Sequence, residues 1–106
     1  MPKYLIEATY TLEGTQGLLH EGGSKRRDAV KAALKSVGGK VEAFYYAFGD
    51  TDVYAIIDAP DNVSAAACAT AINSTGAVQL RTTVLLEPEE MDAAIKKSVK
   101  YRAPGK

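Results

Sequence analysis

Apolar and polar residues alternate along several stretches of the chain, and this period of two predicts β-strands. The clearest pair covers residues 40–48 and 53–57, which are separated by the turn-forming run Gly49, Asp50, Thr51 and Asp52. We therefore predict a β-hairpin within residues 40–61. The same alternation predicts two further strands, over residues 3–10 and 77–86.

Neither face of the predicted hairpin has the polar character of a solvated surface. Val41, Ala43 and Tyr45 are assigned to one face of its first strand, and Phe44 and Tyr46 to the other. An antiparallel sheet commonly leaves one face to water, so a sheet that is apolar on both faces needs two covering layers. We expect helices of the same chain to supply one layer and a second subunit to supply the other.

A helical period appears between the first strand and the hairpin. Ser24 is the predicted N-cap of a helix whose apolar stripe contains Val30, Leu34 and Val37 and which ends before two consecutive glycines. Ahead of it, residues 17–20 are expected to form a short helical turn that buries two leucines. One helix is therefore predicted to connect the first two strands.

Two more helices are predicted after the hairpin. The first is capped by Asp61 or Asn62, runs to about Ser74 and is rich in alanine, which we expect to let it lie close on a sheet. The second begins near Pro88, because proline suits the first turn of a helix and carboxylates suit its positive end. It is expected to bury Met91, Ala94 and Ile95.

The predicted order is strand, helix, strand, strand, helix, strand, followed by a terminal helix. This order predicts an α+β, ferredoxin-like βαββαβ fold with an extra C-terminal helix, in which both connecting helices cover one face of a four-stranded antiparallel sheet. A chain of 106 residues fits one domain. We assign that domain to residues 1–99 and a basic C-terminal tail to residues 100–106.

Charge and composition exclude several classes of function. Thirteen basic and thirteen acidic residues balance, so no overall field attracts nucleic acid or an anionic membrane. No apolar run approaches the ~20 residues of a membrane span, and the first ten residues lack the layout of a signal peptide. The single cysteine, Cys68, allows no internal disulfide. These features predict a cytoplasmic protein that binds neither nucleic acid nor membrane.

Three segments resemble the GYD-domain proteins, small bacterial and archaeal proteins that are mostly uncharacterised. The segments are GGSKRR at 22–27, AFYYAFGDTDVYAIIDAPDN at 43–62 and STGAVQLRTTVLLEPEEMDAA at 74–94. The resemblance implies a ferredoxin-like protomer of the dimeric α/β-barrel superfamily, which includes cofactor-free monooxygenases, heme-degrading enzymes and regulatory ligand binders. The family is named for a Gly, a Tyr and an Asp in the hairpin turn, where this sequence has Gly49, Thr51 and Asp52.

Two groups near the predicted first helix are candidates for chemistry. Lys25, Arg26 and Arg27 lie in its first turn, where cations oppose the helix dipole unless an anion completes the site. Arg27 is the predicted ligand-binding residue of this group, although local pairing with Glu21 or Asp28 also explains the cluster. His20 is the one histidine and the natural general base if the protein is an enzyme, but an exposed histidine without a task explains it as well.

The remaining predicted ligand-binding residues are Tyr45, Tyr46, Tyr54 and Arg81. Strand aromatics are commonly core or interface residues, and the functional alternative is a pocket between sheet and helices that they line. Arg81 can reach such a pocket or cross a dimer interface. No metal site is expected within one chain, because no second histidine or ligand-spaced carboxylate pair accompanies His20.

From the sequence we therefore expect a homodimer or higher homo-oligomer that binds a small molecule or an anion without a cofactor. The first alternative is a cofactor-free monooxygenase-like enzyme with His20 as its base. The second is a structural or regulatory subunit of a protein assembly. A roomy apolar cavity that touches His20 would favour the enzyme, whereas a filled core would favour the assembly role.

Overall fold

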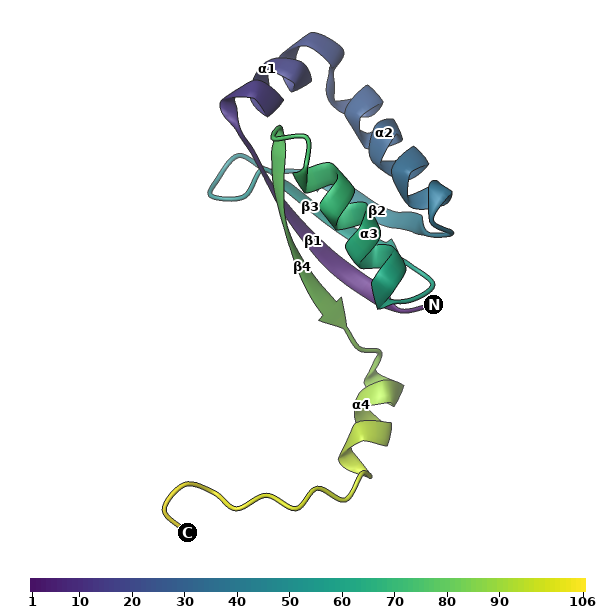
Figure 1. The fold of residues 1–106 in the computed structure, drawn as a ribbon, viewed down its shortest axis with the longest axis vertical. Helices are drawn as coiled ribbons and strands as arrows, with labels where there is room; N and C mark the ends of the chain where they lie inside the picture. Colours follow the sequence, from purple (N-terminus) through teal and green to yellow (C-terminus); the bar gives the residue numbers. More distant parts are fainter.

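Four antiparallel strands form one sheet in the computed structural model, which describes all 106 residues (Figure 1). The strands are β1 (Lys3–Tyr10), β2 (Lys40–Tyr46), β3 (Val53–Asp58) and β4 (Val78–Leu85). Their order across the sheet is β2-β3-β1-β4. This order and the sequence of elements confirm the predicted ferredoxin-like α+β fold.

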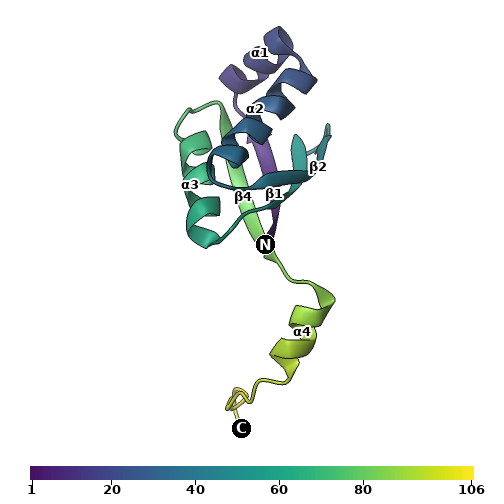
Figure 2. The same cartoon turned by 90° about the vertical axis from the view of Figure 1, so that its right-hand side faces the viewer.

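Four helices accompany the sheet. They are α1 (Leu12–Glu21), α2 (Gly23–Ser36), α3 (Asn62–Asn73) and α4 (Pro88–Ile95). Helices α2 and α3 contribute residues to one core on the same face of the sheet (Figures 1 and 2). The other face carries no helix, so the chain covers only one side of its sheet.

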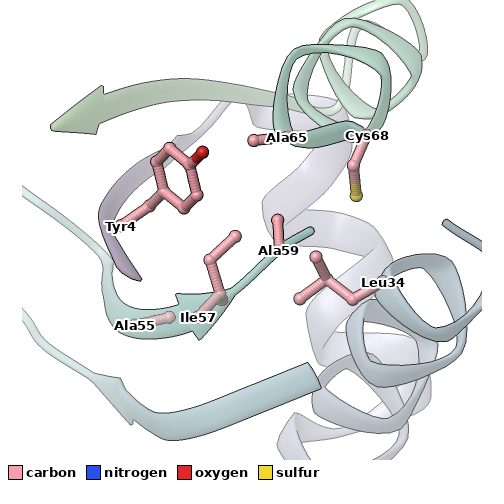
Figure 3. Close-up of a cluster of buried hydrophobic side chains, with 7 residues drawn as sticks. All are labelled: Tyr4, Leu34, Ala55, Ile57, Ala59, Ala65 and Cys68. Atoms are coloured by element: carbon pink, nitrogen blue, oxygen red, sulfur yellow. The ribbon is translucent and has the colours of Figure 1, made fainter. Parts of the chain in front are cut away.

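The main core lies where α2 and α3 meet the covered face (Figure 3). Its buried members are Tyr4, Leu34, Ala55, Ile57, Ala59, Ala65 and Cys68. Tyr4 and Leu34 are each only 1% exposed. The Tyr4 hydroxyl donates a hydrogen bond to Asn62 Oδ1 at 2.6 Å, so its polar end is satisfied inside the fold.

A β-bulge in β2 changes the predicted assignment of faces. The register against β3 shifts between Val41, which pairs with Ile57, and Ala43, which pairs with Ile56. A bulge adds one residue to its strand, and the alternation of side chains resumes out of step after it. Val41 therefore lies on the covered face, and its assignment to the face of Ala43 and Tyr45 was wrong.

The segment before α2 is more helical than predicted. Helix α1 has ten residues, and the Thr11 side chain caps it by accepting a hydrogen bond from the Gly14 N–H at 3.2 Å. Leu18 is half-buried, but Leu19 is 81% exposed, so the expectation that both leucines are buried was wrong. The glycines of this segment concealed the helix, because glycine disfavours helix interiors.

The start of α2 also differs from the prediction. Gly22 is the N-cap residue, with a φ of 90° and no side-chain capping bond, and Ser24 lies inside the helix. This φ is in the region that favours glycine, which allows α1 to end and α2 to begin at one residue. The predicted Ser24 cap was therefore wrong.

Helix α4 extends away from the sheet (Figure 1). A capping box between Glu87 and Glu90 begins it, as the carboxylates there predicted, but Met91, Ala94 and Ile95 are exposed and not buried. The radius of gyration is 16.8 Å, compared with about 13 Å for a compact chain of this length. The extension leaves a short helix with an unpartnered apolar stripe.

Candidate functional site

An apolar cavity of about 250 Å³ lies between the covered face of the sheet and helices α2 and α3. Of its 18 lining residues, 17 are hydrophobic. The sheet contributes Ile6, Ala8, Phe44, Val53 and Val78, among others. Such a space, apolar and bounded by regular elements, is the usual form of a small-molecule site.

Small side chains on both helices leave this space open. Helix α2 contributes Ala29 and Ala33, and α3 contributes Ala65, Cys68 and Ala69. The alanines of α3 were expected to let this helix lie close on the sheet. The side chains that α2 and α3 direct towards the cavity are short, so the protein's own atoms leave this space unfilled.

Arg26 is the one charged residue that lines the cavity. Its guanidinium lies 3.6 Å from Glu21 Oε1, which is longer than a good hydrogen bond. The sequence favoured Arg27, but spacing along the helix could have identified Arg26. It lies four residues before Val30 and seven before Ala33, and so on the same side of α2 as these cavity residues.

The cavity has a polar end at the start of α2. Tyr10 lines both the cavity and an outer depression that also contains Gly23 and Tyr46. The Tyr46 hydroxyl donates a hydrogen bond to the Gly23 carbonyl oxygen at 2.8 Å, which ties β2 to the first residue of α2. Burial, together with the neighbouring Tyr10, raises the pKa of Tyr46 to about 12, against the opposing effect of Arg26 and Arg27.

The three predicted tyrosines do not meet in one place. Tyr45 and Tyr54 are register partners on the uncovered face, where they are 71% and 43% exposed. Tyr46 lies on the covered side, where its ring packs edge-on against Phe44, a cavity residue. Only Tyr46 therefore lies near the cavity, and it does so at the polar end.

Arg81 lies on the uncovered face opposite Glu7 of β1, with 3.7 Å between guanidinium and carboxylate. It also donates a hydrogen bond to Thr51 Oγ1 at 2.9 Å. Thr51 is buried, and the neighbouring Asp52 accepts a hydrogen bond from the Tyr10 N–H at 2.8 Å. Thr51 thus connects the turn to β4.

Arg27 and His20 lie outside the cavity lining. The Arg27 guanidinium is 3.3 Å from Asp28 Oδ1. Local pairing with Asp28 was the expected alternative to anion binding. His20 is exposed in the last turn of α1. The structure therefore does not gather the predicted site residues into a single site, and their roles stay predictions.

Cys68, which the sequence indicates is a small packing residue of the alanine-rich helix, is buried against the cavity. Burial raises the pKa of its thiol, so the reactive thiolate is scarce at neutral pH. This is the environment of a packing residue and not of a nucleophile. Because it is the one cysteine of the chain, a thiol reagent can label the cavity wall selectively at this residue.

No group of three or more His, Cys, Asp or Glu side chains is placed to hold a metal ion. None of the helices combines the length and the apolar character that crossing a membrane requires.

Comparison with known proteins agrees with the resemblance in the sequence. No curated protein matches the chain. The family model of the GYD domain matches residues 4–95, which span the sheet and all four helices. The chain therefore belongs to the GYD domain family.

Proposed function

We propose that this protein binds a small apolar molecule in the cavity between its sheet and helices α2 and α3. The observation that carries the proposal is the lining itself, in which 17 of 18 residues are hydrophobic. An apolar cavity of about 150 Å³ is known to admit benzene. The larger volume here has room for a substituted ring or a medium-length alkyl chain.

The energetic cost of an unfilled cavity supports the same proposal. At about 24 cal/mol per Å³, a void of this volume would cost roughly 6 kcal/mol if it were closed, and it costs less here because the cavity is partly open to solvent. Domains of this size have a total stability of about 5–15 kcal/mol. Larger side chains at Ala33 or Ala69 would remove much of that cost, so the small residues make sense if a ligand fills the space.

Simple binding has more support than either alternative. The enzyme alternative requires a base next to the substrate, and His20 is not among the residues that line the cavity. The assembly alternative was tied to a filled core, whereas this core contains a cavity. A ligand-binding protein requires only the features that are present.

Octanol titration of two matched variants tests the proposal. Ala69→Leu places a larger side chain in the cavity, and Ala66→Leu places the same side chain on the exposed side of α3. We expect octanol to raise the thermal stability of the natural protein and of Ala66→Leu, by about 2.7 kcal/mol at 100 times its dissociation constant, and to leave Ala69→Leu unchanged. Equal responses of the two variants would contradict the proposal.

Cys68 gives an independent measurement on the natural chain. Bound octanol should slow the modification of its thiol by a small methanethiosulfonate reagent, because the thiol lies against the cavity. Unfolded protein, in which octanol has no cavity to occupy, is the control. Modification at the same rate with and without octanol would place any bound molecule elsewhere.

We also propose that two copies of the chain associate through the uncovered sheet face. Large apolar groups on this face are only partly covered, namely Leu5, Ile56, Tyr45, Tyr54 and Leu85. Exposed apolar side chains continue along the C-terminal extension. Partly exposed apolar side chains that gather on one sheet face are typical of an interface, and an isolated eight-residue helix such as α4 needs a partner to be stable. We place this homodimer in the cytoplasm, where a single thiol stays reduced.

Sedimentation velocity with a charge substitution tests the dimer. Tyr45→Glu places a carboxylate on an exposed position of the uncovered face, and Val63→Glu places one on an exposed position of α3. We expect a dimer at micromolar concentration that Tyr45→Glu weakens at least about tenfold and Val63→Glu leaves intact. A natural protein that sediments as a monomer at this concentration would contradict the proposal.

A further inference from the structure

The charge distribution around the cavity identifies the kind of ligand more closely. Apart from Arg26, the lining residues are hydrophobic. A ligand with several polar groups would lose its hydrogen bonds to water and find no partners in this lining, which is unfavourable. The part of the ligand inside the cavity is therefore apolar.

Arg26 supplies the exception at one end. Its side chain belongs to the cavity lining and is also one-third exposed, so Arg26 contacts both the cavity and solvent. The contact with Glu21 at 3.6 Å leaves most of its five N–H donors available. The first turn of α2, which contains Arg26, adds positive potential at the same end.

We propose that the cavity takes a small carboxylic acid with an apolar body, and that Arg26 binds the carboxylate. This inference rests on the proposed function, since it assigns a ligand class to the same cavity. The planar guanidinium matches a carboxylate through two parallel hydrogen bonds. One guanidinium neutralises one carboxylate, and the apolar body then contacts the alanine-lined walls. Glu21 is displaced by the closer and better aligned anion.

The test compares octanoate with octanol, which have the same chain length and differ in charge at one end. Isothermal titration at constant ionic strength and neutral pH should show that octanoate binds the natural protein about tenfold more tightly than octanol, because charge-assisted hydrogen bonds are stronger than neutral ones. Arg26→Gln should remove this preference, because it should weaken octanoate binding far more than octanol binding. Lys31→Gln, which removes one exposed positive charge from the same helix, is the control and should retain the preference.

The outcomes separate this inference from the proposed function. If octanoate and octanol bind the natural protein equally, the carboxylate inference is overturned while cavity binding stands. If neither ligand binds, both fail. If Arg27→Gln removes the preference and Arg26→Gln does not, the assignment to Arg26 is overturned and the residue favoured by the sequence pattern takes its place. If Lys31→Gln also removes the preference for octanoate, the preference comes from the overall charge of α2, and the assignment to Arg26 is overturned.

Discussion

The two faces of the sheet carry comparable apolar side chains but have different surroundings. On the covered face, Tyr4 is 1% exposed beneath α2 and α3, whereas Tyr45 and Tyr54 on the other face are 71% and 43% exposed and have no helix over them. The covered face nevertheless contains the cavity. An apolar strand pattern thus indicates that a face requires cover, but not which atoms provide it or whether they fill the space.

Truncation of one residue on each face should separate the two faces most strongly. Leu34→Ala removes a fully buried side chain of α2, and we expect a loss of about 2–5 kcal/mol in the free energy of unfolding. Ile56→Ala, on the uncovered face, should cost less than half as much in dilute protein, because water already reaches this side chain. Chemical denaturation measures both values.

Protein concentration sharpens this measurement. If a second copy covers the outer face, the cost of Ile56→Ala should rise with protein concentration, while that of Leu34→Ala should change little. Equal costs of the two substitutions in dilute protein would show that the faces do not differ as described.

The second expected effect concerns the hydrogen bond that joins the covered face to the start of α2. The Tyr46 hydroxyl has a pKa of about 12 in the folded protein and an ordinary value of 10.0. The folded state therefore holds this proton more tightly than the unfolded state. The stabilisation is complete below pH 10 and is lost as the pH rises through 12.

Between pH 10 and pH 12, the free energy of unfolding of the natural protein should fall by about 1 kcal/mol more than that of Tyr46→Phe. This figure allows for solvent screening of a partly exposed group. Tyr45→Phe, on the exposed face, is the control and should behave as the natural protein does. Parallel losses in the natural protein and Tyr46→Phe would refute the assignment.

Much of the fold could be predicted because regular alternation and helix stops act locally. β1 has the predicted bounds, and Asp61 caps α3 as one of the two predicted residues. Helix α1 was underestimated because glycine has poor helix propensity. Gly14 is nonetheless required, since a Cβ atom there would lie 1.9 Å from the carbonyl oxygen of Ala77. This requirement comes from a segment distant in sequence and is not visible locally.

The candidate site was harder to predict for a related reason. Alanines such as Ala33 and Ala69 are compatible both with close packing of a helix on the sheet and with a cavity between them. The sequence alone does not distinguish the two. The bulge near Glu42 moved Val41 to the covered face, and no local pattern signals it. Helical spacing, which placed Val30 and Leu34 on the inward side of α2, could also have identified Arg26. Arg27 was predicted instead because the prediction used the cluster of positive charges and did not consider which side of the helix each side chain occupies.

The smallest expected effect is a change in octanoate affinity at the polar end of the cavity. Glu21→Gln removes the carboxylate that competes for Arg26, and exposed ion pairs contribute about 0–1 kcal/mol, so octanoate should bind about two- to threefold more tightly. Glu13→Gln removes an exposed carboxylate from the first turn of the same helix and is the control. Titration of both variants measures the change. An equal increase in both would mean that the overall charge of α1, and not the release of Arg26 from Glu21, controls the affinity. An increase only in Glu21→Gln would show that Arg26 exchanges its carboxylate partner when the ligand enters.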